Sequence, residues 1–164
     1  GIGLFSKKPL LEAEVLELGS AGVPTLQARF MLNGATISLL ATHPVPPIGA
    51  RMTRLRNEQL QALSAHIRGV SGPLLLVGDL NASRWSQPFR MLQKETGLHD
   101  SALGRGWQPT WPTTLPLLGI PIDHALHTPD LQTLRREILG EIGSDHRPLL
   151  VEIGYEVPAG RPEA

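Results

Sequence analysis

The chain contains no cysteine and carries no net charge. The absence of cysteine excludes disulfides, thiolate metal sites and cysteine nucleophiles, although it does not identify a cellular compartment. Because 15 basic and 15 acidic residues cancel, the chain has no bulk field for nucleic acid, and only a local basic patch would attract it. No apolar run approaches the roughly 18 residues of a membrane-spanning helix. The composition, 41% hydrophobic and 18% charged over 164 residues, predicts one globular domain with a sizeable core.

The stretch from Leu74 to Asn81 combines an apolar strand with two polar side chains. Four apolar residues follow a Gly-Pro pair, and this short run bounded by turn formers favours a strand buried on both faces over a helix. The run stops at Gly78, and Asp79 and Asn81 follow at alternating positions. On an extended backbone these two side chains point to the same side. They would emerge together at a strand end, where α/β sheets usually bind ligands. A simple Asx-turn after the strand is the competing interpretation.

The rest of the chain predicts a single α/β domain. The Asn33-Gly34 pair is a strong signal for a two-residue hairpin, so the opening third is expected to be an antiparallel meander. Strands are expected over residues 1–6, 16–18, 25–32, 35–42, 74–77, 122–127 and 149–153. Helices are expected over residues 51–68 and 83–97, and residues 129–140 form either a strand or a short helix. The domain covers residues 1–154, and residues 155–164 are expected to form a flexible tail.

Three further features allow two interpretations each. His43 ends an expected strand, as Asp79 does, and is either a site residue or a loop histidine. Arg51, Arg54 and Arg56 lie in the first turns of the expected helix, where cations oppose the helix dipole. They form either a solvated face or an anion site. The loop over residues 104–121 is unusually long and carries two tryptophans, which indicates a substrate-facing flap or a surface loop fixed to the domain.

Four short motifs occur in order along the chain. They are Thr42-His43, Gly78-Asp79-Leu80-Asn81, Ile122-Asp123-His124 and Ser144-Asp145-His146. The series resembles the endonuclease/exonuclease/phosphatase superfamily, the metal-dependent phosphoesterases related to DNase I, and the resemblance extends to about Ile153. The fuller phrasing, with Thr110-Trp111-Pro112 and Pro121 to His124, resembles a bacterial branch that is often carried behind membrane-spanning segments.

The resemblance implies an α/β fold, a four-layered DNase I-like sandwich of two mostly antiparallel sheets with outer helices. Members of the superfamily begin with a longer N-terminal part that carries an early Asn and a metal-binding Glu. Gly1 corresponds to a point past both, so we expect a fragment that lacks the first strands and shows weak or no turnover by itself. Membrane anchoring through an upstream segment, and hence an extracytoplasmic location, would follow from the bacterial branch.

The resemblance also assigns a metal ion and an attacking water. Asp145 would bind Mg²⁺, with Mn²⁺ as the alternative ion, while water and substrate phosphate complete the octahedron. Asp79 would position or deprotonate the water. Asn81 would orient Asp79 or the phosphate.

Two histidines complete the implied site. His43 and His146 would donate hydrogen bonds to phosphoryl oxygens or protons near the reaction centre. Asp123 would hold His146 in the useful tautomer, so we expect these two side chains to meet at about 2.6 to 3.2 Å. His124, on the opposite side of the strand, is expected to tolerate substitution much better.

Three classes of function remain open. The first is a metal-dependent nuclease, phosphodiesterase or phosphatase that acts on nucleic acid, a phospholipid, or a polyprenyl or sugar phosphate. The second is a truncated domain that binds a phosphate ligand without turnover. The third is an interaction domain with relic motifs, which the complete set of polar residues disfavours. No protein partner is inferred.

Overall fold

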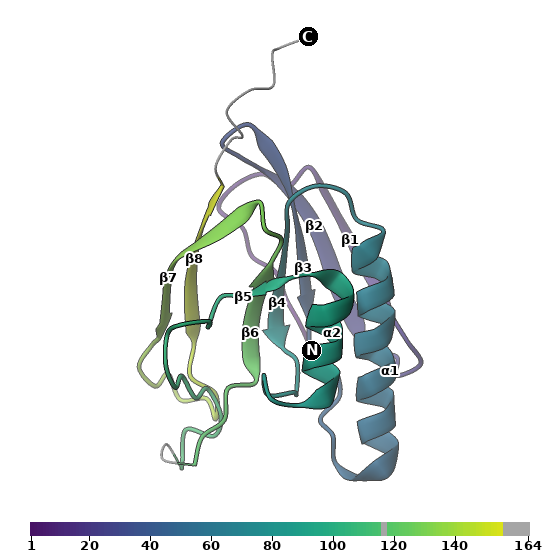
Figure 1. The fold of residues 1–164 in the computed structure, drawn as a ribbon, viewed down its shortest axis with the longest axis vertical. Coiled ribbons are helices and arrows are strands. Elements are labelled where there is room, and N and C mark those ends of the chain that lie inside the picture. The colour runs from purple at the N-terminus through teal and green to yellow at the C-terminus, as the bar shows by residue number, and fades with distance from the viewer. Residues whose placement is uncertain (116–117, 156–164) are drawn as a thin grey trace.

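The computed structural model describes residues 1–115 and 118–155. A six-stranded sheet, in the order β1-β2-β3-β4-β6-β5, forms the centre of the molecule, and a two-stranded sheet of β7 and β8 packs beside it (Figure 1). The elements in chain order are β1 (Glu12–Glu17), β2 (Pro24–Leu32), β3 (Ala35–Thr42), α1 (Gly49–Arg68), β4 (Leu74–Asp79), α2 (Gln87–Thr96), β5 (His99–Asp100), β6 (Asp123–His127), β7 (Leu131–Ile138) and β8 (Leu149–Tyr155).

The opening third is the antiparallel meander that the sequence predicts. β2 and β3 pair with Leu32 opposite Ala35, and the turn between them is Asn33-Gly34. Both turn residues have positive φ, 49° and 81°, as a type I′ hairpin turn requires. The prediction of a strand over residues 1–6 is wrong, because this segment forms no strand. β1 begins later, at Glu12, where pairing with Arg29 of β2 starts.

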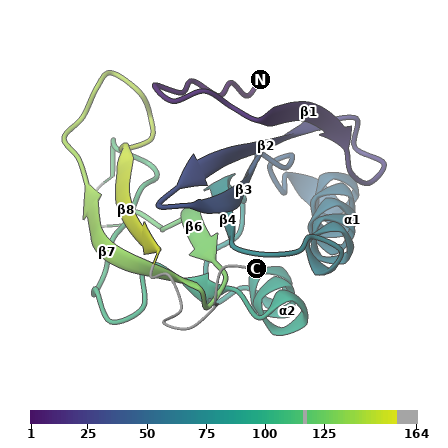
Figure 2. The same ribbon diagram turned by 90° about the horizontal axis from the view of Figure 1, so that it is seen from above.

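The main core lies between the six-stranded sheet and the two helices. Leu74 and Leu76 of β4 point into it and are buried against apolar residues of α1 and α2, including Leu63 and Phe89. Both helices cover this one face of the sheet, whereas β7 and β8 lie on the other side (Figure 2). The predicted two-sheet α/β sandwich is therefore confirmed. The described residues supply the helix layer, one large sheet and two strands of the second sheet.

The second face of β4 is only half-buried. Leu75 and Val77 point away from the helices and border a cavity with Leu149 and Val151 of β8. The prediction that this strand is buried on both faces is thus correct for the helix side only. The reason is that β7 and β8 alone form the described part of the second sheet, and they do not extend across the whole large sheet.

Helix boundaries differ slightly from the expected ones. α1 begins at Gly49, two residues before the expected start. α2 begins at Gln87 with Ser86 as its N-cap, although Ser83 was expected to begin the helix. Residues 83–86 form a turn in which Ser86 N–H donates to the Ser83 carbonyl. Residues 129–140 resolve to the strand alternative, β7.

The first residue of the expected flexible tail belongs to a strand. Tyr155 is part of β8 and pairs with Leu131 of β7. The remainder of the expected tail lies outside the described residues. No helix within residues 1–115 and 118–155 is long and apolar enough to cross a membrane.

Candidate active site

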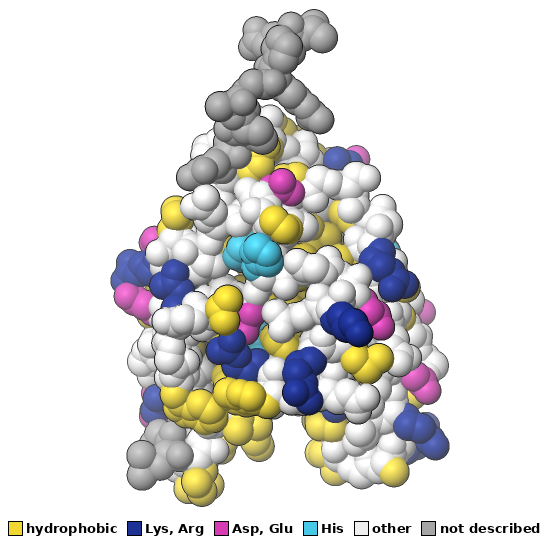
Figure 3. All heavy atoms as spheres, viewed as in Figure 1, with side chains coloured by type: hydrophobic (Ala, Val, Ile, Leu, Met, Phe, Trp, Pro, Cys, Tyr) yellow, Lys and Arg dark blue, Asp and Glu magenta, His cyan; other side chains and the backbone are white. Residues whose placement is uncertain are grey.

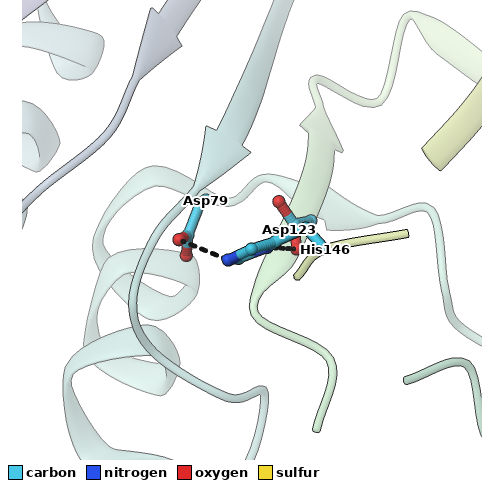
Figure 4. Close-up of side chains that lie close together, drawn as sticks. All are labelled: Asp79, Asp123 and His146. Atoms are coloured by element: carbon cyan, nitrogen blue, oxygen red, sulfur yellow. Dashed lines mark hydrogen bonds and ion pairs between the residues drawn. The ribbon is translucent and has the colours of Figure 1, made fainter. Parts of the chain in front are cut away.

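Four of the residues that the sequence singled out meet at one end of the six-stranded sheet. Asp79 is the last residue of β4, and Asp123 is the first residue of β6, its antiparallel neighbour. The two face each other in register. His43 follows β3, which runs parallel to β4, so it emerges at the same edge. His146 lies just before β8 and reaches the same point from the second sheet, where it lies between the two carboxylates (Figure 4).

The His146 imidazole bridges the two carboxylates. Its Nδ1–H donates to Asp123 Oδ2 at 2.8 Å, while its Nε2 lies 3.8 Å from Asp79 Oδ2. His43 also approaches Asp79, with Nε2 3.4 Å from the same oxygen. The expected contact between Asp123 and His146 is thereby confirmed. The four side chains form one continuous array of alternating histidines and carboxylates.

Asp79 is the most enclosed of these groups. Its side chain is 11% exposed. Burial raises the pKa of the Asp79 carboxyl above its ordinary value, and the neighbouring Asp123 carboxylate also raises it. The Asn81 backbone N–H and the histidines His43 and His146 lower it, but less than burial raises it. The structure therefore holds a carboxylate whose negative charge is poorly solvated, beside a second acid, in a position where a cation would stabilise both.

Asn81 adopts the left-handed backbone conformation, with φ of 47°, so the strand does not continue through it. Its backbone N–H donates to Asp79 Oδ1 at 2.7 Å, which is the Asx-turn that the sequence left as an alternative. Its side-chain Nδ2 donates to the Pro44 carbonyl at 2.9 Å. Asn81 thus orients Asp79 through its main chain and fixes the loop after His43 through its side chain.

Arg56 is a positioning residue that the sequence interpretation missed. It belongs to α1, is buried, and its guanidinium donates to the Asn81 carbonyl. Burial lowers the pKa of Arg56. The sequence grouped Arg56 with the exposed Arg51 and Arg54. Its position, four residues before the buried Leu60 on the same helix face, was the available signal.

Asp145 and the residues beside it are held by hydrogen bonds to the long loop over residues 104–121. Trp111 Nε1–H donates to Asp145 Oδ2 at 3.2 Å, and Thr113 N–H donates to the Asp145 carbonyl at 2.9 Å. Arg147 N–H donates to the Thr110 carbonyl at 2.8 Å. The loop over residues 104–121 is thus fixed to the turn that carries Asp145 and His146, as its second interpretation expects. Its Trp111 also lines the cavity beside these residues.

These residues enclose an open cavity of about 480 Å³. Its polar residues are His43, Asp79, Asn81, Asp145 and His146. Its apolar residues are Pro46, Pro47 and Ile48 from the loop before α1, and Trp111, Ile120 and Ile122 from the other side. The cavity therefore has a polar floor of acids and histidines between two apolar walls.

A group of three side chains beside this cavity could hold a metal ion. One donor atom from each of Asp79, Asp123 and His146 lies within 4.8 Å of the other two. Carboxylate oxygens are the donors that hard divalent cations such as Mg²⁺ and Mn²⁺ prefer. Asp145 is not part of this group but is exposed on the wall of the same cavity. The donor chemistry fits a divalent cation at this end of the sheet.

His124 lies on the opposite face of β6, as the sequence predicts, but it is not a free surface residue. Its ring packs on Phe89 of α2 with centroids 4.5 Å apart, and its Nε2–H donates to the Ala82 carbonyl at 2.8 Å. Burial lowers the pKa of His124 to about 4, although the hydrogen bond to Ala82 opposes this effect. The expectation that His124 tolerates substitution therefore overlooks its place in the core, where it is 3% exposed.

The fold is an α/β sandwich, and its acids and histidines gather at one edge of the large sheet. The model of the Endonuclease/Exonuclease/phosphatase family matches residues 1–146, and the chain belongs to that family. Its fold is the DNase I-like fold. A comparison with curated protein sequences finds no match.

Solved structures with the same fold are distant in sequence. An endonuclease/exonuclease/phosphatase from Beutenbergia cavernae DSM 12333 superposes with a TM-score of 0.76 at 20% identity, over 92% of this chain and 46% of that chain. Humanized D. rerio TDP2 gives 0.69 at 16% identity, over 88% and 67%. The human Nocturnin catalytic domain, solved with a bound sulfate anion, gives 0.68 at 18% identity, over 90% and 60%. The chain thus spans about half to two thirds of the length of these proteins.

Proposed function

We propose that this chain carries the phosphate-ester hydrolase site of its family and acts with a divalent cation, Mg²⁺ or Mn²⁺. The observation that carries the proposal is the array of His43, Asp79, His146 and Asp123, of which the first three line one cavity. Phosphoester cleavage requires an oriented water, donors for the phosphoryl oxygens and compensation for their negative charge. The array contains side chains for the first two tasks, and Asp145, which lines the same cavity, would hold the cation for the third.

Asp79 is the group we assign to the attacking water. Its pKa is raised, mainly by burial, and this makes the Asp79 carboxylate a stronger base toward the attacking water. The Asn81 N–H fixes one of its oxygens, Oδ1, at 2.7 Å. Its Oδ2 is the atom that faces both His43 and His146 and is therefore the oxygen directed toward the reacting phosphate.

His146 is the group we assign to a phosphoryl or leaving oxygen. Its Nδ1–H is engaged by Asp123, which fixes the ring orientation and leaves Nε2 to face the cavity. His43, which is half-exposed and also faces Asp79 Oδ2, would donate to a second phosphoryl oxygen. Two histidines beside one carboxylate would thus both contact the phosphate.

The cation would be held by Asp145, with water and substrate phosphate as its other ligands, and would supply charge neutralisation on the phosphoryl oxygens. Trp111 occupies one Asp145 oxygen and leaves the other free. The group of Asp79, Asp123 and His146 is the second candidate. We favour Asp145 because Mg²⁺ prefers oxygen donors, whereas the second group includes a histidine nitrogen.

The alternative, a domain that only binds phosphate, is less well supported by the charges. A simple anion site is lined with cations and N–H donors. Here two acids, Asp79 and Asp145, line the cavity and would repel phosphate unless a cation neutralised them.

The test is hydrolysis of bis-p-nitrophenyl phosphate and p-nitrophenyl phosphate, followed with Mg²⁺, with Mn²⁺ and with excess EDTA. We expect weak turnover that EDTA abolishes and that the divalent cation restores. Binding of inorganic phosphate with no hydrolysis of either ester would instead favour the binding domain.

A further inference from the structure

The walls of the active-site cavity continue outward as exposed apolar residues. On one side, Ile48 is 77% exposed, and Met52 lies one turn further along α1. On the other side, Trp111 and Ile120 form an isolated antiparallel bridge, and the chain between them carries Leu115 and Leu118, the latter 74% exposed. We call these two groups the apolar lips. They flank the cavity because Ile48, Trp111 and Ile120 all line it.

The space-filling view shows the same arrangement on the whole molecule. The end of the molecule below the sheet is notched, and hydrophobic side chains gather on both lobes beside the notch (Figure 3). Singly scattered apolar residues on a surface need no explanation, whereas a set concentrated on both sides of a cleft indicates an apolar ligand or surface. A nucleic acid or a free sugar phosphate would instead favour polar and cationic walls.

Two arginines lie close in the chain to the first apolar lip. Arg51 and Arg54 are exposed in the first turns of α1, directly after Ile48, and the first turn contains no acidic residue. Neither arginine forms an ion pair with any residue in the described part of the chain. Cations at a helix N-terminus oppose the helix dipole, so helix stability does not account for them. Apolar side chains beside basic ones are the combination that binds an anionic lipid surface.

We propose that the apolar lips dock on an anionic lipid surface and that the substrate is a phosphate ester carried by an amphiphile in that surface. This inference rests on the proposed function, because it assigns the substrate of the same cavity. The lips would enter the boundary between headgroups and acyl chains, Arg51 and Arg54 would contact anionic headgroups, and the ester would reach Asp79 and His146 between the walls.

The experiment is flotation of the protein with vesicles of phosphatidylcholine alone and of phosphatidylcholine with phosphatidylglycerol. We expect binding that increases with phosphatidylglycerol and decreases with salt. Leu118→Glu should weaken vesicle binding at least about 10-fold, because it places a charge at the lipid boundary. Leu134→Glu is the matched control, since Leu134 is 62% exposed but lies on β7 beside Gly154, outside the cavity. It should bind vesicles as the parent does.

Other outcomes separate this inference from the proposed function. If the soluble nitrophenyl esters are hydrolysed but no vesicle is bound, or if both variants lose binding equally, the lipid inference fails and the hydrolase proposal stands. If vesicles are bound but neither a soluble nor a vesicle-borne ester is hydrolysed, the hydrolase proposal fails and the substrate assignment fails with it. A dimer by light scattering that Leu118→Glu dissociates would assign the lips to self-association and overturn the lipid inference.

Discussion

His146 Nδ1 lies 2.8 Å from Asp123 Oδ2, although the two residues are 23 positions apart in the chain. The bond joins the turn before β8 to the first residue of β6, and therefore couples the small sheet to the large one at the site. Because Nδ1–H is held, Nε2 is the nitrogen directed at Asp79 and the cavity. The contact thus sets both the orientation and the tautomer of the imidazole on which the proposed chemistry depends.

Asp123→Asn tests this relationship. Asparagine keeps the size of the side chain but removes the charge that fixes the Nδ1–H tautomer. We expect kcat to fall roughly 10- to 100-fold while KM changes little, because the residue does not itself contact the substrate. Steady-state kinetics across a pH series provide the measurement. Asp130→Asn, an exposed aspartate in the turn between β6 and β7, is the control. An equal loss in both variants, or a loss confined to KM, would contradict the positioning role.

Asp145→Asn tests the proposed metal ligand. The substitution removes a negative charge with little change in volume, so we expect the Mg²⁺ concentration at half-maximal activity to rise at least about 10-fold. Titration of activity with Mg²⁺ measures the effect, and a far-UV spectrum checks the fold. Glu141→Gln is a suitable control because Glu141 is an exposed acid nearby in the chain. The Mg²⁺ requirement could instead stay unchanged in Asp145→Asn and rise in Asp123→Asn. That result would assign the ion to the group of Asp79, Asp123 and His146.

Gly78→Ala tests the close approach of β3 and β4 beneath the site. Gly78 has φ of 143°, and a Cβ placed there would overlap the Thr42 carbonyl oxygen. We expect the free energy of unfolding to fall by about 3 kcal/mol or more, because both the backbone conformation and the contact oppose any side chain. Urea unfolding measures it. Gly140→Ala, at a glycine with open space around it, should change stability by less than about 1 kcal/mol. An equal loss of stability in the two variants would contradict the close approach of β3 and β4 at Gly78.

Because His124 is buried, we expect the free energy of unfolding to depend on pH. Its folded-state pKa is lowered from 6.5 to about 4, so the unfolded chain binds the proton more tightly than the folded one. The contribution of neutral His124 is present above pH 6.5 and is lost as the pH falls from 6.5 toward 4, by about 3 kcal/mol at most. Urea unfolding at a series of pH values measures this, and the stability difference between the parent and His124→Gln should shrink over that interval. A constant difference would show that His124 does not titrate differently on folding.

The sequence predicted which candidate residues lie near one another, but it did not predict the local geometry of each residue. Asp79 was singled out because it follows an apolar strand, and strand ends are the usual ligand position in α/β sheets. Asp123 was singled out through the motif Ile122-Asp123-His124 and the family resemblance. The Asn33-Gly34 turn was found because few other pairs adopt two positive φ values. These features depend on residues close together in the chain, and the pattern alone specifies them.

The remaining features depend on residues far apart in the chain. Asn81 orients Asp79 with its main chain because Arg56 and Pro44 hold it from other segments. His124 is buried because α2 places Phe89 against it. Trp111 reaches Asp145 because the long loop folds back on the last turn. No local pattern specifies these contacts, since each requires the packed sheet and helices to bring the partners together.

The central claim is that the paired acids and histidines hydrolyse a phosphate ester. It is tested most directly by the rate of bis-p-nitrophenyl phosphate hydrolysis with Mg²⁺ for the parent and for His146→Asn. His99→Asn, at an exposed histidine on β5, is the matched control. The account predicts that His146→Asn lowers kcat about 10²- to 10⁴-fold and that His99→Asn leaves it unchanged. A hydrolysis rate that His146→Asn does not lower, or no hydrolysis by the parent, would contradict it.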